Sequence, residues 1–348
     1  MGKILPYFMI LFVTNVAMSQ NEFQNAFNDA ARPSVQNIRI DLSDDAGNAS
    51  HLPISIIKGK GQGPVFTIVA GVHGFEYPPI IATQELMQEI DIHRLNGTIV
   101  IIPIASMGAF FNRTPFTSPE DKVNLNGVFP GKADGSITQQ KAHFITTNII
   151  AVSDVFLDIH GGDAPEDLLP FICYYDNSKK PKQTALAKQL CEESGFQYVV
   201  SYPYTISDTD PARYTFKQAV QDGKTALSIE CGRLGNVTKE EVALIKKSVF
   251  SMLTTMEMYP GAMAPHPNII YRNSQTYIKA KVQGIFYSKY IAGDTVKKGD
   301  IVGYTTDEFG VLLEQYKAPK DGIVLYNLAT PPINVNTTVM CISSYEEN

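Results

Sequence analysis

Short apolar runs alternate with longer amphipathic stretches along most of the chain, and this pattern predicts an α/β fold. Apolar runs that are rich in β-branched residues and bounded by glycine or proline are typical of buried strands. They occur at residues 64–72, 97–104, 155–160, 170–174, 198–201 and 225–230. Helices are predicted between them, at residues 78–87, 138–150, 182–194, 211–221 and 238–258. Strands that alternate with helices in this way form a sheet that is covered on both faces.

Two segments before this series, residues 37–42 and 52–57, alternate apolar and polar positions. This alternation predicts edge or antiparallel strands. A long polar loop is expected at residues 106–136. Loops of this length are usually functional or disordered, and the proline, asparagine and glycine residues of this one favour defined turns.

Local signals mark the last two helices and the end of the α/β pattern. Asp210 is the expected N-cap of the helix at 211–221, and the sequence from Thr238 to Glu241 is a capping box for the helix that follows. At residues 260–267 proline and glycine cluster, and no long helix comes after them. A linker followed by a small all-β domain is therefore expected.

Residues 1–19 have the features of a secretory signal peptide. Lys3 supplies a positive charge, residues 4–13 are apolar, and residues 17–19 form a small-x-small cleavage site before Gln20. The alternative is an uncleaved membrane anchor, but the apolar core is shorter than the roughly 20 residues that a span needs. The mature protein is therefore expected to be secreted or periplasmic and not associated with a membrane.

The overall composition is that of a globular protein, with 44% hydrophobic and 18% charged residues among 348. This length allows one large domain and a smaller one. The net charge of −6 argues against a nucleic-acid partner. The cysteines fit no zinc–thiolate spacing and are too few for a disulfide framework, and their pairing and the oligomeric state stay open; they are Cys173, Cys191, Cys231 and Cys341.

The strand at 64–72 leads into a loop that carries His73 and Glu76. Open α/β sheets bind their ligands at the carboxyl ends of strands, and an imidazole and a carboxylate three residues apart can both reach one zinc ion there. His160 ends the strand at 155–160 in the same way. Two imidazoles and one carboxylate predict a zinc site whose fourth position is open to water, which is the catalytic arrangement.

Other polar residues could complete such a site. Asp158 has two interpretations, because it could orient a ligand imidazole or be a buried carboxylate with a backbone partner. Hydrolysis at zinc needs a carboxylate that moves the proton of the attacking water to the leaving nitrogen, and Glu230, alone at the end of a buried strand, is the candidate. Arg113, in the long loop, is the candidate cation for the developing oxyanion. A solvated arginine without a role is its alternative.

Four motifs come in the order seen in the succinylglutamate desuccinylase/aspartoacylase family, which the mature chain resembles over nearly its whole length. They are Gly-Val-His-Gly-Phe-Glu at 71–76, Asn-Leu-Asn-Gly-Val-Phe-Pro-Gly at 124–131, Leu-Asp-Ile-His at 157–160 and Ile-Glu-Cys-Gly at 229–232. The family consists of zinc hydrolases related to the metallocarboxypeptidases. The resemblance therefore implies a mixed, twisted sheet flanked by helices, followed by a small all-β sandwich domain.

The same resemblance implies roles for particular residues. His73, Glu76 and His160 would bind zinc. Glu230 would act as the general base and acid, and Arg113 would polarise the scissile carbonyl.

One position departs from the family pattern. The family motif usually reads Asn-Leu-Asn-Arg-x-Phe-Pro-Gly, and Gly127 stands where the arginine belongs. By the resemblance, that arginine clamps a substrate carboxylate, and Asn126 remains available to hydrogen-bond the substrate. Arg233 and Arg213 are the nearest replacement cations by sequence position. The departure bears on the choice of substrate more than on the hydrolytic chemistry.

The C-terminal part resembles the lipoyl/biotinyl sandwich fold in its residues 292–303 and 317–324. In carrier proteins of that fold, the hairpin between these stretches presents a modified lysine. Residues 306–310 contain no lysine here, so no attached cofactor is expected, and the domain is expected to wall the mouth of the active site. The expected organisation is a signal peptide, a zinc hydrolase domain and a lipoyl-like β-sandwich domain, at residues 1–19, 20–265 and 266–348.

The sequence thus predicts a zinc-dependent hydrolase that cleaves an amide bond of a small molecule, either an N-acyl amino acid or a short peptide. A deacylase and a carboxypeptidase-like enzyme both remain open. The alternative function is a non-catalytic protein of the same fold that binds a ligand in its zinc pocket. Gly127 favours this alternative, whereas Glu230 disfavours it, because binding alone needs no general base.

Overall fold

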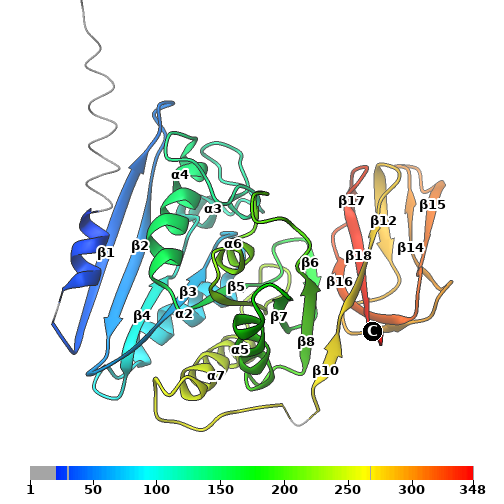
Figure 1. Ribbon diagram of the computed structural model, residues 1–348. Coiled ribbons are helices and arrows are strands. Elements are labelled where there is room, and N and C mark those ends of the chain that lie inside the picture. The colour runs from blue at the N-terminus through cyan, green and yellow to red at the C-terminus, as the bar shows by residue number, and fades with distance from the viewer. Residues whose placement is uncertain (1–20, 30, 267, 348) are drawn as a thin grey trace, which may run out of the picture.

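The computed structural model describes residues 21–29, 31–266 and 268–347. The segment predicted as a signal peptide, 1–19, lies outside the described residues. Within them, a mixed nine-stranded sheet has the order β1-β2-β4-β3-β5-β9-β7-β8-β10 (Figure 1). Its strands are β1 (Ser34–Ser43), β2 (Ala49–Lys58), β3 (Gly61–Ala70), β4 (Asn96–Ile102), β5 (Val155–His160), β7 (Phe171–Asp176), β8 (Tyr198–Pro203), β9 (Thr225–Glu230) and β10 (Ile270–Arg272).

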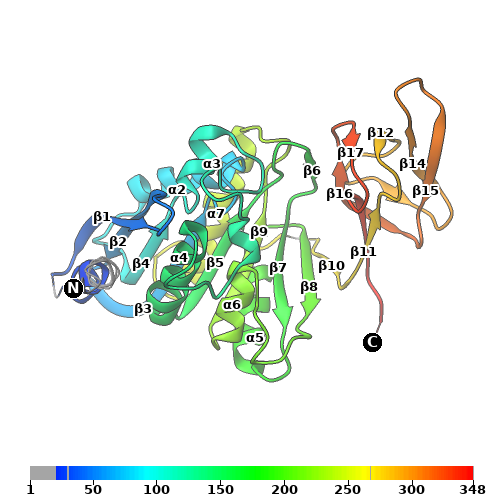
Figure 2. The same cartoon turned by 90° about the horizontal axis from the view of Figure 1, so that it is seen from above.

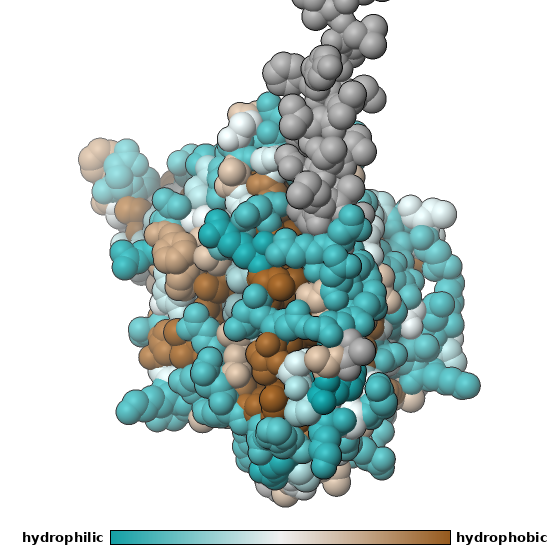
Figure 3. All heavy atoms as spheres, turned by 90° about the vertical axis from the view of Figure 1, so that its left-hand side faces the viewer, coloured by the Kyte–Doolittle hydropathy of each residue, from teal (hydrophilic) through white to brown (hydrophobic). Residues whose placement is uncertain are grey.

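Parallel pairing places the central strand ends on one edge of this sheet. β4, β3, β5 and β9 run parallel to one another, whereas β1 with β2, β2 with β4 and β7 with β9 are antiparallel. The outer strand β1 alternates exposed and more buried positions, as predicted for an edge strand. Figure 3 shows this side of the molecule, where hydrophilic atoms surround a few hydrophobic ones, which limits pairing with another strand.

Helices cover both faces of the sheet, and each face has its own hydrophobic core. One core joins the sheet to α2 (Tyr77–Glu89), α5 (Pro181–Glu192) and α7 (Lys239–Thr255). The other joins it to α4 (Ile137–Phe144), its π-helical continuation η2 (Ile145–Ile150), α6 (Thr215–Gln221) and the helical residues 21–28. Along β5, Leu157 and Ile159 enter the first core and Phe156 the second. Since side chains alternate along a strand, Asp158 and His160 lie on the same face as Phe156.

Two antiparallel sheets form the C-terminal unit. One contains β11 (Ser274–Lys279), β18 (Thr338–Ser344), β16 (Gly322–Leu328) and β13 (Thr295–Val296), and the other β15 (Leu312–Lys317), β14 (Ile301–Thr306), β12 (Gly284–Ser288) and β17 (Pro332–Ile333). A core that includes Phe286, Val302, Val324 and Met340 lies between them. Figure 2 shows this unit beside the main sheet, beyond β8 and β10. The predicted fold class, a mixed sheet flanked by helices and followed by a β-sandwich, is confirmed.

Several details differ from the expected elements. The helix expected at 211–221 begins only at Thr215, with Tyr214 as its N-cap, because the Asn126 side chain accepts a hydrogen bond from the Thr215 amide. The Asp210 carboxylate instead accepts one from the Ser207 amide. The long loop contains α3 (Met107–Asn112) and the short 3₁₀ helix η1 (Leu125–Gly127).

The junction between the two parts of the molecule was not visible in the sequence pattern. β6 (Glu166–Leu168), which follows β5 in the chain, pairs with β16 of the C-terminal unit. β10 lies past residue 265, where the hydrolase domain was expected to end, and still joins the main sheet through β8. The described residues include no helix of the length and apolarity that crossing a membrane requires.

Candidate metal centre and active site

The predicted metal ligands lie at the carboxyl edge of neighbouring parallel strands. His73 and Glu76 follow β3, where Gly71 takes a positive φ of 63° at the turn. His160 is the last residue of β5, the strand that pairs with β3. Glu230 is the last residue of β9 and stands directly opposite His160 in the strand register. All four residues therefore meet at the edge where open α/β sheets bind ligands.

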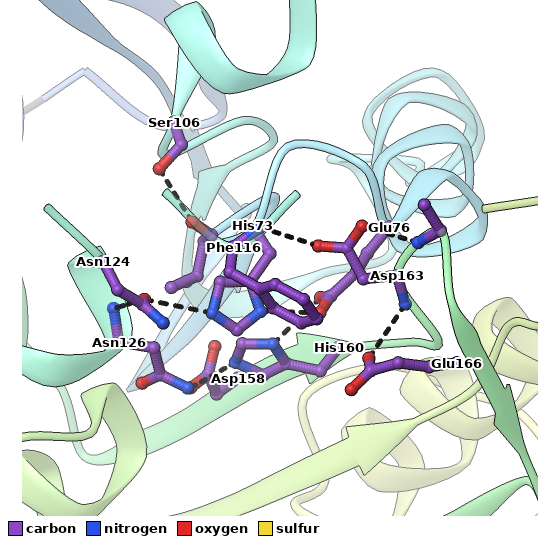
Figure 4. Close-up of polar contacts among 12 residues, drawn as sticks. His73, Glu76, Ser106, Phe116, Asn124, Asn126, Asp158, His160, Asp163 and Glu166 are labelled. Atoms are coloured by element: carbon purple, nitrogen blue, oxygen red, sulfur yellow. Dashed lines mark hydrogen bonds and ion pairs between the residues drawn. The ribbon is translucent and has the colours of Figure 1, made fainter. Parts of the chain in front are cut away.

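Three of these side chains converge on one point (Figure 4). The Glu76 carboxylate lies between the two imidazoles, with Oε1 2.7 Å from Nδ1 of His73 and Oε2 2.9 Å from Nδ1 of His160. One potential ligand atom from each of the three residues falls within 4.8 Å of the others. The sequence-based grouping of His73, Glu76 and His160 is thus one cluster in space.

The outer nitrogen of each ring faces an oxygen. Nε2 of His73 is 3.1 Å from Oδ1 of Asn124. Nε2 of His160 is 3.1 Å from Oδ2 of the fully buried Asp158, a close charge contact that is not aligned as a hydrogen bond. Oxygen atoms at these positions favour a proton on Nε2, which leaves the Nδ1 lone pairs directed into the cluster. Asp158 therefore faces the imidazole of a candidate ligand, as the first of its two interpretations requires.

Burial and charge shift the pKa values within the cluster in opposite directions. Burial raises the pKa of the Glu76 carboxyl, but the two imidazoles outweigh it and hold that pKa at about 2. Burial lowers the pKa of both imidazoles, yet nearby carboxylates raise it above the usual value, Glu76 at His73 and Asp158 with Glu76 at His160. Glu76 thus favours the protonated form of both rings, and a metal ion that binds there has to displace protons from them.

The donor set fits zinc. Two imidazole nitrogens and one carboxylate are the ligands of many catalytic zinc sites, which keep a fourth position open. The carboxylate and amide oxygens behind the rings supply the outer contacts that orient such ligands. His73, Glu76 and His160 are the residues that would hold the ion.

A cavity of about 310 Å³ opens beside this cluster. It is lined by His73, Glu76, Phe116, Asn126, His160, Gly161, Glu166, Leu168, Phe171, Tyr202, Glu230, Tyr277, Leu325, Tyr326, Thr338 and Cys341. The last five of these residues belong to β11, β16 and β18 of the C-terminal unit. The prediction that the C-terminal domain walls the mouth of the site is therefore confirmed.

Glu230 and Asn126 both line this cavity, in agreement with the roles assigned to them. Burial raises the pKa of the Glu230 carboxyl well above its usual value, although the charge of His160 opposes this shift. Asn126 Oδ1 accepts hydrogen bonds from the Thr215 amide and hydroxyl at 2.9 and 3.2 Å. The Asn126 amide nitrogen has no hydrogen-bond partner among the described residues, so a donor is left for a ligand.

Arg113 does not line the cavity. It is exposed and ends α3 with a left-handed backbone, at a φ of 51°. α3 packs closely against Gly74, and Phe116, three residues after Arg113, places its ring 5.8 Å from that of His73. Arg113 therefore lies on the loop that borders the site, and its action on the scissile carbonyl stays a prediction.

The surroundings of Gly127 bear on the missing arginine. A side chain at Gly127 would meet open space, with only Cβ of Asn124 within 4 Å, at 3.9 Å. Arg233 is already bound to Asp167, with Nε 2.6 Å from Oδ1. Arg213 is exposed, and its backbone pairs with Phe129, two residues beyond Gly127. Of the two candidate replacement cations, Arg213 is the one beside the motif and without a hydrogen-bonded carboxylate among the described residues.

Several residues of the site were not singled out from the sequence. Asn124 belongs to a recognised motif, and that motif was the available signal for its contact with His73. Glu166 lines the cavity, and burial, with a further contribution from the charge of Glu76, raises its pKa to about 7. No local pattern marks Glu166, Tyr277 or Tyr326, because strands from distant parts of the chain bring them together.

The fold and the cluster define a mixed α/β protein with a candidate metal centre at its strand ends. Comparison identifies the class: the sequence model of the succinylglutamate desuccinylase/aspartoacylase catalytic domain matches residues 62–256, and the chain belongs to this family. The resemblance inferred from the four motifs is thus confirmed.

Individual relatives match almost the whole chain. The N-alpha-acetyl-L-2,4-diaminobutyric acid deacetylase of Halomonas elongata is 27% identical over 322 residues, which cover 89% of this chain and 91% of the relative. The crystal structure of a succinylglutamate desuccinylase/aspartoacylase from Rhodobacter sphaeroides aligns with a TM-score of 0.81 at 21% identity, covering 92% and 98% of the two chains. The product-bound ectoine utilization protein EutE (DoeB) of Ruegeria pomeroyi aligns with a TM-score of 0.80 at 23% identity, covering 90% and 97%.

These comparisons bear on the activity only at the level of reaction class. The curated relative is a deacetylase, and the family carries the names of deacylases. Relatives of this kind indicate an amide-bond hydrolase that acts on a small molecule. The two crystal structures, at less than 25% identity, show the fold.

Proposed function

We propose that this protein is a zinc-dependent deacylase that cleaves the amide bond of a small N-acyl amino acid. The observation that carries the proposal is the cluster itself: potential ligand atoms of His73, Glu76 and His160 lie within 4.8 Å of one another, with Glu230 opposite His160 on the next strand. The deacetylase activity named for the Halomonas elongata relative supports a deacylase over a carboxypeptidase-like enzyme. A cavity of about 310 Å³ also suits a small substrate.

The chain's own residues divide the work of the reaction. When bound, zinc supplies Lewis acidity toward the attacking water and the scissile carbonyl. Glu230 takes the proton of that water as a carboxylate and returns it to the leaving nitrogen, so the carboxylate is regenerated in each turnover. Asn126 offers its amide N–H to an oxygen of the substrate. Asn124 and Asp158 keep the His73 and His160 rings in place.

The test is hydrolysis by zinc-loaded protein of a panel of N-acyl amino acids and dipeptides, read as release of a ninhydrin-reactive amine. Nα-acetyl-L-2,4-diaminobutyrate, the substrate named for the curated relative, is the first member of the panel. Hydrolysis of an N-acyl amino acid that stops with a chelator and returns with zinc is the expected result. Zinc binding without hydrolysis of any member would instead support the non-catalytic alternative.

Metal content tests the ligand set separately. The His160→Ala protein should lose most of its bound zinc, because two remaining ligands rarely hold the ion against a chelator. The wild type should retain about one ion per chain. His93→Ala, which removes an exposed histidine far from the cluster, is the matched control. Full zinc occupancy of His160→Ala would overturn the assignment of this ligand.

A further inference from the structure

The cavity beside the metal centre is acidic and aromatic. Among the residues that the structure describes, those lining the cavity include three glutamates and no lysine or arginine. They also include five aromatic residues: Phe116, Phe171, Tyr202, Tyr277 and Tyr326. Glu76 is paired with the imidazoles of His73 and His160, so Glu166 and Glu230 are the carboxyls of this lining that remain unpaired. Unpaired carboxylates attract ligands of the opposite charge, and aromatic faces attract cations. This lining therefore suits a positively charged group rather than a second carboxylate.

Only one of the three glutamates is left without a task in the proposed reaction. Glu76 has one oxygen on each imidazole, and Glu230 is the proton carrier. Glu166 accepts a single hydrogen bond, from the Asp163 amide to Oε2 at 3.0 Å. Its Oε1 has no hydrogen-bond partner among the described residues. One carboxylate oxygen is thus available to a ligand in the cavity.

The position of Glu166 suits contact with a bound substrate. It begins β6, and in Figure 4 its carboxylate is directed from the side of Asp163 toward the cluster of Glu76 and His160. β6 pairs with β16, so Tyr326 lies close by, and the charge of Glu166 contributes, after burial, to the raised pKa of this tyrosine. Glu166 therefore sits where the main sheet and the C-terminal unit close around the cavity.

No lysine or arginine forms an ion pair with this carboxylate among the residues that the structure describes. Arg233, whose neighbour Leu234 donates its amide to the Glu166 carbonyl, is bound through Nε to Asp167, the residue after Glu166. An arriving ammonium group would meet a carboxylate oxygen that is partly removed from water, and charge-assisted hydrogen bonds of this kind are stronger than neutral ones. A carboxylate of the substrate would instead be repelled.

We propose that Glu166 binds a free ammonium group of the substrate, so that the enzyme selects N-acyl derivatives of diamino acids over neutral and dicarboxylic ones. The inference rests on the proposed deacylase function and assigns the part of the substrate that lies away from the scissile amide. Tyr326, from the C-terminal unit, supplies an aromatic face next to the same ammonium group. Glu166 is thus a specificity-determining residue.

The test compares two substrates that differ in charge. Nα-acetyl-L-2,4-diaminobutyrate carries an ammonium group where Nα-acetyl-L-norvaline has a methyl group, and the two are otherwise of equal length. Zinc-loaded wild type should have at least a tenfold higher kcat/KM for the cationic substrate. Glu166→Gln keeps an acceptor for the Asp163 amide and removes the charge, so this ratio should fall tenfold or more. Glu308→Gln, which removes the same charge from an exposed hairpin, should keep the wild-type ratio.

A wild-type ratio near or below one would overturn the inference whatever the variants do. An unchanged ratio in Glu166→Gln, with zinc content and thermal unfolding like wild type, would overturn it as well. Calorimetric binding of L-2,4-diaminobutyrate and L-norvaline to the zinc-loaded protein separates the two proposals. Preferential binding of the diamino acid that Glu166→Gln abolishes supports the inference even if no amide is hydrolysed. Hydrolysis without any charge preference leaves the deacylase standing and removes Glu166 from recognition.

Discussion

At the scale of single residues, the site works through side chains that are held in place by partners from elsewhere in the chain. His73 faces Asn124 from the long loop, and His160 faces Asp158 from its own strand. These contacts turn both Nδ1 atoms toward Glu76. Glu230 stands opposite His160 on the next strand and lines the cavity, and its carboxyl has no hydrogen-bond partner among the described residues. Its freedom fits a group that must take up and release a proton.

The first prediction concerns this residue. Glu230→Gln preserves the shape of the side chain and removes its basicity, so turnover should fall by roughly 10²–10⁴. Zinc content should stay at the wild-type level, because the substitution leaves all three residues of the cluster in place. The measurements are kcat on the preferred N-acyl substrate and metal analysis of the same sample. An active variant would move the general base to another residue.

A second prediction concerns Gly127. The site has room for an arginine there, and a guanidinium can pair a carboxylate in bidentate fashion. Dicarboxylic N-acyl amino acids should be poor substrates of the wild type, because one charge-assisted contact worth about 1.5–3 kcal/mol is missing. Gly127→Arg should raise kcat/KM for N-succinyl or N-acetyl acidic amino acids by roughly ten- to a hundredfold. Gly127→Gln, which adds bulk without charge, is the control.

This role for position 127 would be refuted by two results together. The wild type would already prefer dicarboxylic substrates, and Gly127→Arg would not move the preference further in that direction. Substrate ranking of both proteins on one panel gives the answer.

The sequence was sufficient for residues whose position at a strand end is a local property. His73, His160 and Glu230 each follow a short apolar run, and parallel pairing brings such ends together. Glu166 was missed, because its strand has three residues and its partner strand lies far later in the chain, at Gly322–Leu328. No pattern within β6 indicates that contact. The pairing of β6 with β16, and the place of Glu166 in the cavity that follows from it, become visible only in the folded molecule.

At the scale of elements, the same contrast between local and distant signals explains which helix ends were predicted. Thr238 caps α7 through its own side chain, which accepts a hydrogen bond from the Glu241 amide, so the capping box was a sufficient signal. The predicted start of α6 was wrong, because the amide of its first residue donates a hydrogen bond to Asn126, which lies 89 residues away in the chain. The distant contact also ties α6 to the motif beside the active site.

The start of α4 shows a further case of distant capping, and it yields the third prediction. Asp44 and Asp121 accept hydrogen bonds from the Ile137 and Thr138 amides, each at 3.0 Å. Burial raises the pKa of both carboxyls, but the hydrogen bonds they accept outweigh it and lower the pKa below the usual value. Asp44→Asn or Asp121→Asn should each reduce the free energy of unfolding at pH 7 by about 0.5–2 kcal/mol.

The sign of the pH dependence follows from the lowered pKa values. A carboxyl with a depressed folded-state pKa contributes stability above its unfolded pKa of about 4, and this contribution is lost as the pH falls through the folded-state pKa. The difference between wild type and either variant should therefore shrink on acidification. Urea unfolding across the acid range measures it. The exposed neighbour Asp45→Asn is the control, and a difference that stays constant with pH would show that charge plays no part in these caps.

At the scale of the whole molecule, the chemistry and the walls of the site come from different units. The three candidate metal ligands and Glu230 lie at strand ends of the main sheet. Tyr277, Tyr326 and Thr338 reach the cavity from the C-terminal strands. The division predicts that loosening the junction changes substrate binding more than it changes metal binding. The junction includes the pairing of β6 with β16, a hydrophobic cluster that contains Leu168 and Leu325, and one buried carboxylate.

That carboxylate is Asp167, and it provides the last prediction. Its Oδ1 accepts a hydrogen bond from Arg233 at 2.6 Å, and its Oδ2 accepts one from the Ala292 amide of the C-terminal unit at 2.8 Å. Asp167→Asn can accept only one of these bonds, so the free energy of unfolding should drop by about 1.5–3 kcal/mol. KM for the N-acyl substrate should rise while zinc content stays unchanged and kcat changes less, because the candidate metal ligands and Glu230 are untouched.

Hydrogen exchange at β16 measures how far the junction is loosened. Asp321→Asn is the control, because Asp321 forms an exposed pair with Lys297 within the C-terminal unit. Faster exchange at β16 with an unchanged KM would mean that the C-terminal wall does not contribute to substrate binding.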